Sequence, residues 1–215
     1  MITVAVVGGG AAGMMAALEA ASRGAAVSVF ERQNRVGRKL AVTGNGRCNL
    51  TNINATTLSY HGAEAGFAAP ALRRFSVTET LAHFRGLGLL TVTEPDGRVY
   101  PLSDTAGSVV DVLRFAMDAS GVRLKDSCEV IALERSGSGW RVVCPDGPFP
   151  ADRVIIACGG MARRPRRTAF TFRQAIPLRV SPKVEWQFKR SHNAKERFFC
   201  EHRRAVFCAF RALSN

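Results

Sequence analysis

The sequence has 215 residues, which suits one domain of ordinary size or a domain with an appendage. Its formal net charge is +13, and residues 163–215 hold 14 of the 30 Lys and Arg residues but only 3 of the 17 Asp and Glu residues. No apolar run approaches the roughly 18 residues of a membrane span, so the sequence predicts no membrane-spanning segment. The basic excess therefore belongs to the last quarter of the chain.

Cysteine and histidine usage favours a cytoplasmic protein without a metal site. The six cysteines stand at irregular separations with no CxxC pair, and the N-terminal MITVAVV lacks the basic region of a signal peptide. We therefore expect reduced thiols in the cytoplasm. The four histidines fall at no metal-ligand spacing, and we interpret them as surface residues.

The N-terminus predicts a strand, a glycine turn and a helix. ITVAVV is a short apolar run rich in β-branched residues, GGGAAG follows at residues 8–13, and MMAALEAASRG has helix-forming composition and ends at Gly24. A second β-branched run, AAVSVFE, ends at Glu31. This order is typical of a βαβ unit.

The glycine turn matches the dinucleotide-binding pattern GxGxxG. Gly8 would make the tight turn, Gly10 would let the backbone approach a pyrophosphate, and Gly13 would let the helix pack closely on the strand. Ala11 and Ala12 lie in this turn next to the N-terminus of the helix, whose free N–H groups suit phosphate. Glu31 stands where a carboxylate accepts hydrogen bonds from the ribose hydroxyls. The alternative is a glycine turn that serves packing alone.

The polar loop at residues 35–52, RVGRKLAVTGNGRCNLTN, is too rich in glycine and asparagine for the core of a helix or strand. It resembles the GRK and SGxGRCNxTN loop of the BaiN-like, or aminoacetone-oxidase-like, family of bacterial FAD-dependent oxidoreductases, closely over residues 37–52, with Thr43 in place of the usual Ser. The unit before it fits NAD and FAD equally, so this resemblance is what favours FAD.

The resemblance implies a role for each charged or small residue of this region. Arg38 and Lys39 would approach the phosphates or ribose of the cofactor, and Arg32 would join Glu31 at the nucleotide. The residues implied to line the flavin region are Gly44, Gly46, Arg47, Cys48 and Asn49. For Cys48, a small buried filler and a redox role are equal alternatives.

Residues 94–121 predict a turn at Asp96 and Gly97, a short extended piece before Pro101, and then an amphipathic helix. The helix is indicated by apolar residues at helical spacing, Val109, Val110, Leu113 and Met117. The segment resembles the family's GRxFPxSxxAxxVxxxL, which implies that Arg98, Tyr100 and Ser103 lie on the substrate side of the flavin. A structural turn followed by a core helix is the alternative.

Residues 122–160 predict three β-rich runs, VRLKDSCEVIALER, GWRVVCPDG and DRVIIACGG, separated by the turn signals SGSG and PDGPFPA. The resemblance implies that this is a β-meander in which the Val130 backbone meets the adenine. It also implies that Ala157, Gly159 and Gly160 return to the cofactor, with Cys158 in place of the usual Thr. Glycines suit that turn because a side chain would strike the cofactor.

The pattern stops after Ala162. RRPRR follows at residues 163–167, and residues 161–215 contain no glycine, although the chain has 20. Our hypothesis is that 1–162 is the FAD-binding domain and that 163–215 is a disordered product of a shifted reading frame, because the local consistency of a natural foldable sequence is lost at one point. A tail that binds nucleic acid, a partner or a membrane surface is the alternative.

These features predict an α/β protein with a Rossmann-type domain. The resemblance implies that the domain binds FAD, carries a β-meander and is an incomplete member of the two-dinucleotide-binding-domain flavoprotein type. The expected function is an FAD-dependent oxidoreductase with NAD(P)H as an electron donor, truncated and inactive or weakly active, with a small-molecule substrate. We expect no nucleic acid and no membrane as partners. The alternative is a non-enzymatic nucleotide-binding protein with a basic nucleic-acid-binding or partner-binding tail.

Overall fold

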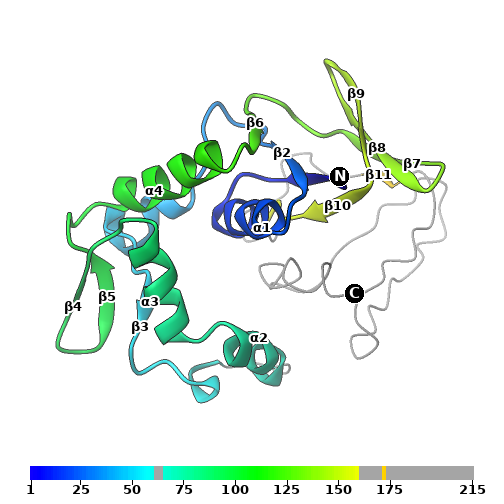
Figure 1. Cartoon of the computed structure of the whole chain (residues 1–215). Helices are drawn as coiled ribbons and strands as arrows, with labels where there is room; N and C mark the ends of the chain where they lie inside the picture. The colour runs from blue at the N-terminus through cyan, green and yellow to red at the C-terminus, as the bar shows by residue number, and fades with distance from the viewer. Residues whose placement is uncertain (61–64, 160–170, 173–215) are drawn as a thin grey trace, which may run out of the picture. The chain divides into compact units, whose positions relative to one another are not determined.

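The computed structural model describes residues 1–60, 65–159 and 171–172. These residues divide between two compact units, one formed by Met1–Val36 with the chain from Met117 onward and the other by Gly37–Ala116. We describe each unit by itself (Figure 1). None of the helices in the described part of the chain is long and apolar enough to cross a membrane.

The first unit is built on a parallel sheet. Its strand order is β10-β1-β2-β6, and every neighbouring pair is parallel. The elements are β1 (Thr3–Val7), α1 (Ala11–Ser22), β2 (Ala26–Phe30), β6 (Arg123–Lys125) and β10 (Arg153–Ile156). The predicted strand, glycine turn, helix and second strand are thereby confirmed.

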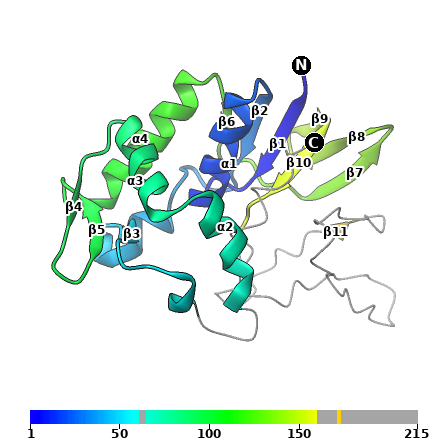
Figure 2. The same cartoon turned by 60° about the horizontal axis from the view of Figure 1, so that its bottom comes forward.

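The residues of β1 are buried on both faces of this sheet. Val4 and Val6 alternate with Ala5 and Val7, and all four side chains are at most 3% exposed. Helix α1 contacts β1, β2 and β10 on one side, as Figure 2 also shows. Burial on both faces explains why the sequence of β1 is a continuous apolar run and does not alternate.

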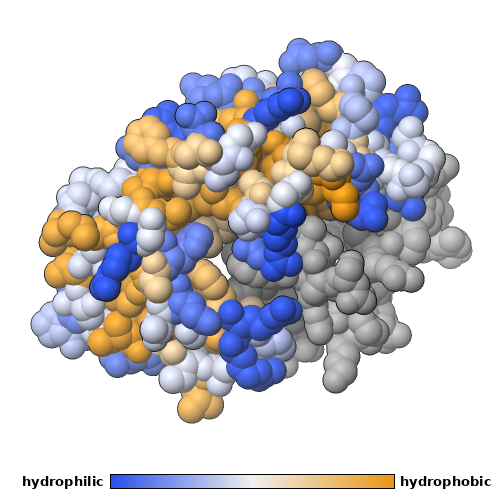
Figure 3. All heavy atoms as spheres, in the orientation of Figure 1, coloured by the Kyte–Doolittle hydropathy of each residue, from blue (hydrophilic) through white to orange (hydrophobic). Residues whose placement is uncertain are grey.

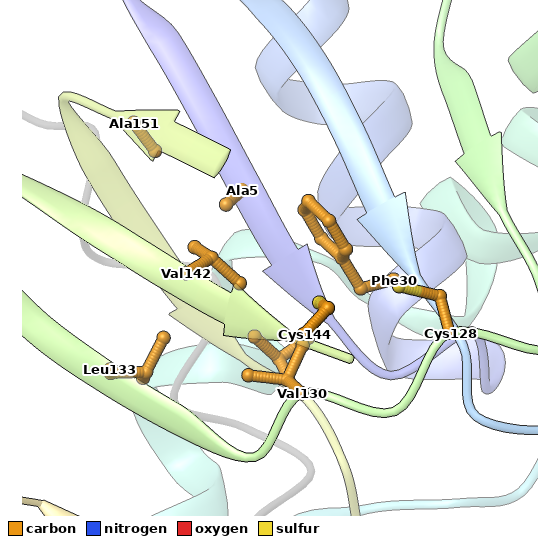
Figure 4. Close-up of a cluster of buried hydrophobic side chains, with 9 residues drawn as sticks. Ala5, Phe30, Cys128, Val130, Leu133, Val142, Cys144 and Ala151 are labelled. Carbon is orange, nitrogen blue, oxygen red and sulfur yellow. The ribbon is translucent and has the colours of Figure 1, made fainter. Parts of the chain in front are cut away.

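A separate, mainly antiparallel sheet covers the other face. Its order is β11-β7-β8-β9, from β7 (Ala132–Ser136), β8 (Gly139–Cys144), β9 (Gly147–Ala151) and the short β11 (Thr171–Phe172), which runs parallel to β7. Side chains from β1, β2, β7, β8, β9 and the segment between β6 and β7 meet in one buried cluster (Figure 4). It is made of Ala5, Val7, Phe30, Cys128, Val130, Leu133, Val142, Cys144 and Ala151. The predicted β-meander is therefore β7-β8-β9.

Two details of the strand prediction were wrong. The run at residues 122–135 is split, because β6 joins the parallel sheet beside β2 whereas β7 begins the meander. The segment PDGPFPA was predicted as a turn, but Gly147–Ala151 form β9. Pro148 and Pro150 alternate, so both missing N–H groups lie on one side of the strand, and β9 is an edge strand whose outer side needs no donors.

The second unit carries a small antiparallel sheet in the order β3-β5-β4, formed by β3 (Thr51–Asn52), β4 (Thr91–Thr93) and β5 (Arg98–Pro101). Its helical segments are η1 (Leu40–Gly46), η2 (Thr57–Ser59), η3 (Ala65–Ala68), α2 (Ala69–Arg74) and α3 (Val77–Gly86), with α4 (Ala106–Ala119) extending from this unit into the first. Hydrophobic side chains reach the surface over α4 and the β4–β5 hairpin (Figure 3).

The predicted amphipathic helix is confirmed as α4. Val109, Leu113 and Met117 are each at most 2% exposed, which is the i, i+4, i+8 spacing of one buried helix face. The predicted turn at residues 96–97 is also confirmed, since Gly97 has φ +84° and its N–H donates to the Glu94 carbonyl. Helix α3 was not predicted, although its capping box of Ser76 and Glu79 is visible in the sequence.

Candidate nucleotide-binding site

The strand ends of the first unit bring the predicted nucleotide residues together. Val7 is in register with Phe30 of β2 and with Ile156 of β10. The residues that follow these three strand ends are Gly8, Glu31 and Ala157, so they lie at the same edge of the parallel sheet. Ligands of open α/β sheets bind at this carboxyl edge.

Gly8 and Gly13 have packing reasons to be glycine. Gly8 has φ +108°, and a Cβ atom on it would lie 2.6 Å from the Ala157 carbonyl oxygen. A Cβ atom on Gly13 would overlap the Gly8 carbonyl oxygen. The tight turn and the close approach of α1 to β1 predicted for these two glycines are therefore seen directly in the backbone.

Gly10 differs from both, because a Cβ atom on it would meet no described atom within 4 Å. Its φ of −80° and ψ of −177° are open to any L-residue, so neither strain nor packing requires glycine here. It is the N-cap of α1 and has no side chain to cap the first N–H groups of that helix, at Ala11 and Ala12. Open space over uncapped donors fits a phosphate group.

The Glu31 carboxylate is held by backbone donors on two sides. Oε2 accepts a hydrogen bond from the Gly9 N–H at 2.8 Å, and Oε1 accepts one from the Gln33 N–H at 2.9 Å. A carboxylate has about four acceptor positions, so capacity remains for ribose hydroxyls. Gly9 was missed by the sequence analysis, which gave no role to the middle residue of GxG.

The remaining predicted residues of the first unit lie near this edge or in the core beside it. Val130 is 5% exposed in the buried cluster, close in sequence to Cys128, whose N–H donates to the Glu31 carbonyl. The Ala157 N–H donates to the Val7 carbonyl, and Gly159 has φ +81°. Arg32 is exposed. Gly160 lies outside the described residues.

The predicted flavin-lining loop belongs to the second unit and is strongly bent. Gly44, Asn45, Gly46 and Cys48 all have positive φ values, between 55° and 87°. A Cβ atom on Gly44 would lie 2.7 Å from the Asn49 backbone nitrogen. Both this contact and the positive φ value require glycine at residue 44. Asn49, Gly46, Arg38 and Lys39 are exposed.

Arg47 is engaged by its own unit. Its guanidinium donates to Glu94 at 2.9 Å and to Asp104, and it lies 4.0 Å above the centre of the Tyr100 ring. The hydrogen bonds to Asp104 and Glu94 raise the pKa of Arg47. This network joins the loop to the turns after β4 and β5, and no motif in the sequence indicates these partners.

Cys48 is 4% exposed, and burial raises the pKa of its thiol, partly offset by a hydrogen bond with Thr43. Burial likewise raises the pKa of Cys144 to about 12, with a further contribution from its hydrogen bond with Cys128. Thiolates are the reactive form of cysteine, so these environments favour packing roles. The four cysteines of the described residues, Cys48, Cys128, Cys144 and Cys158, are present as thiols.

The parallel sheet, the helix after its first strand and the glycine turn between them define a Rossmann-type fold. The family model described as HI0933-like protein Rossmann domain matches residues 2–175. The chain therefore belongs to the HI0933-like Rossmann family, and the predicted α/β fold class and family resemblance are confirmed. The match extends past the predicted boundary at Ala162, which itself stays a prediction.

Two curated relatives and one solved structure illustrate the likeness. The 3-dehydro-bile acid delta(4,6)-reductase of Clostridium scindens is 40% identical over 166 residues, which are 76% of this chain and 40% of the relative. The ribosomal RNA dihydrouridine synthase of Haemophilus influenzae is 26% identical over 161 residues, 73% of this chain and 40% of the relative. The glycine oxidase of Geobacillus kaustophilus has 20% identity and a TM-score of 0.48, covering 74% of this chain and 56% of that one.

The chain thus spans about 40% of the length of these curated relatives.

Proposed function

We propose that this chain binds FAD and forms the nucleotide-binding part of an FAD-dependent oxidoreductase. The observation that carries the proposal is the open space over Gly10, in a turn whose two other signature glycines are each required by packing. The 40% identity to a reductase and the family match support the redox assignment. Bound FAD would supply the capacity to accept and return an electron pair.

Each group of residues would have a separate task in holding this cofactor. The N–H groups of Ala11 and Ala12 would donate to the pyrophosphate over Gly10, and Glu31 would accept hydrogen bonds from the adenosine ribose, with Arg32 beside it. The Val130 backbone would meet the adenine, and Ala157, Gly159 and Gly160 would form the returning turn. Arg38 and Lys39 would approach the phosphates or ribose.

In the second unit, we propose that the loop of Gly44, Gly46, Cys48 and Asn49 lies at the flavin. Asn49 is the exposed polar member and offers both donors and acceptors. Arg47 would keep this loop in shape through Glu94, Asp104 and Tyr100, since its guanidinium already has these partners.

The substrate class that we propose is a C=C bond conjugated to a carbonyl group. The names of the two curated relatives share this chemistry, because a 3-dehydro steroid with Δ4,6 double bonds is a dienone and dihydrouridine is uridine saturated next to a carbonyl. Saturating such a bond consumes two electrons and two protons. NAD(P)H would be the external electron donor.

This substrate class predicts that FAD photoreduced on the chain without oxygen, with EDTA as the electron donor, is reoxidised by a conjugated enone. A saturated ketone of the same skeleton should leave the reduced flavin absorbance unchanged. Both compounds should be tested on the unmodified chain and on the Asn49→Ala variant. We expect Asn49→Ala to slow the reoxidation of reduced FAD by the enone. FAD that binds but is not reoxidised by any enone would contradict the substrate class proposed for this chain.

The ribose assignment predicts that Glu31→Ala weakens FAD and ADP binding about 10- to 150-fold. Losing a charge-assisted pair of hydrogen bonds corresponds to roughly 1.5–3 kcal/mol. Isothermal titration calorimetry with FAD and with ADP measures the two dissociation constants. Glu19→Ala is the matched control, because Glu19 lies on α1 and its side chain pairs only at the surface with Arg23 in the described structure. An unchanged dissociation constant in Glu31→Ala would exclude the ribose contact.

A further inference from the structure

The turn between β1 and α1 contains a residue whose packing reaches the Glu31 carboxylate. A Cβ atom on Gly9 would lie 2.6 Å from Cγ1 of Val36 and 3.1 Å from Cβ of Glu31. The N–H of the same residue donates to Oε2 of Glu31 at 2.8 Å. Gly9 is buried, and Val36 is 5% exposed. Gly9 thus orients the Glu31 carboxylate through its N–H, and its lack of a side chain allows the carboxylate to lie close to the turn.

We propose that Gly9 is a positioning residue that acts on nucleotide specificity. Its backbone N–H and its lack of a side chain together orient the Glu31 carboxylate so that it can accept hydrogen bonds from the ribose hydroxyls of a bound nucleotide. This inference rests on the proposed nucleotide site but adds a residue and a role to it. Gly9 itself touches no ligand in this account, and it acts through Glu31.

The backbone around Glu31 explains why the carboxylate has little freedom to adjust. Its N–H donates to the Lys125 carbonyl at 2.8 Å, and its carbonyl accepts from the Cys128 N–H at 2.9 Å. The preceding Phe30 carbonyl accepts from the Gly8 N–H at 2.8 Å. A methyl group on Gly9 would also lie 3.3 Å from Oε2 of Glu31. With its main chain fixed on both sides, Glu31 can relieve this tight contact only by rotating its side chain.

Gly9 and Gly10 are therefore expected to control different parts of one nucleotide. A methyl group at residue 9 would displace the carboxylate and lower recognition of the ribose hydroxyls. A methyl group at residue 10 would enter open space over the first N–H groups of α1 and lower binding of the phosphates. The ratio of affinities for a ribonucleotide and its 2′-deoxy form separates the two effects. Weaker phosphate binding lowers both affinities equally and leaves this ratio unchanged.

The test measures the dissociation constants of ADP and 2′-deoxy-ADP by isothermal titration in the full 215-residue chain. We expect the unmodified chain to prefer ADP by about tenfold, the effect of one hydrogen bond to a charged group. Gly9→Ala should bring this preference close to one. Gly10→Ala should weaken both ligands and keep the preference.

A rescue variant makes the steric cause testable. Val36→Ala removes Cγ1, the nearest atom to the added methyl group, so the double variant Gly9→Ala with Val36→Ala should regain most of the preference for ADP. If Gly9→Ala alone does not fold, the double variant still tests the positioning role of Gly9. A folded double variant without the preference contradicts the steric cause, and Gly9→Ala with the full preference contradicts the positioning role. If the unmodified chain binds neither ligand, it is the proposed nucleotide site that fails.

Discussion

Replacing Gly10 with valine is expected to weaken FAD and ADP binding by more than about a hundredfold, or roughly 2.7 kcal/mol, while the fold stays intact. The backbone at Gly10 suits any L-residue, and a Cβ atom there meets no described atom within 4 Å. The branched side chain would instead occupy the space proposed for the pyrophosphate. Isothermal titration gives the affinity, and thermal unfolding monitored by circular dichroism reports the fold.

Gly86→Val is the matched control for this prediction. Gly86 ends α3, and a Cβ atom there also meets nothing described within 4 Å. We expect this variant to bind as the unmodified chain does. Retained binding in Gly10→Val would show that the turn does not hold phosphate, whereas a large loss of thermal stability would show that the space over Gly10 is needed for folding.

Replacing Gly13 with alanine is expected to destabilise the fold by about 3 kcal/mol or more, at the upper end of overpacking effects. The added Cβ atom would overlap the Gly8 carbonyl oxygen, which is backbone and cannot rotate away. Helix α1 would have to move off β1, where Met14 and Ala17 are fully buried. The free energy of unfolding in urea measures this loss.

Gly107→Ala provides a control of opposite sign. Gly107 is also near the start of a helix, α4, but its nearest described neighbour for a Cβ atom is Thr105 Oγ1 at 3.8 Å. Alanine there should stabilise the chain by about 0.5–1 kcal/mol, the usual gain of Gly to Ala in a helix. Equal effects of the two substitutions would contradict the close helix–strand contact at Gly13.

The sequence predicted β1, α1, β2 and α4 because their signals are local. Each is a single run whose composition or apolar spacing is typical of its own element, ended by glycine or by a polar residue. The division of residues 122–135 between two sheets could not be read in this way, since it depends on β6 pairing with β2. The proline-containing β9 was missed for a related reason, because edge position is a property of the whole sheet.

In the candidate site too, residues in a local motif could be predicted, whereas contacts between distant parts of the chain could not. Gly8, Gly13 and Glu31 stand at motif positions, and the structure places them at one sheet edge. The partners of Arg47 are Glu94, Tyr100 and Asp104, which are distant in sequence and have no fixed spacing. The need for glycine at residue 9 depends likewise on Val36, whose position only the fold reveals.

The central claim, that the strand edge of the first unit holds the nucleotide part of FAD, is tested most directly by titrating FAD into the full chain and then adding ADP. Flavin fluorescence should report one saturable site per chain, and ADP should displace FAD from it competitively. Gly10→Val should abolish both signals. The account is contradicted if FAD binds without competition from ADP, or if the folded chain binds neither ligand.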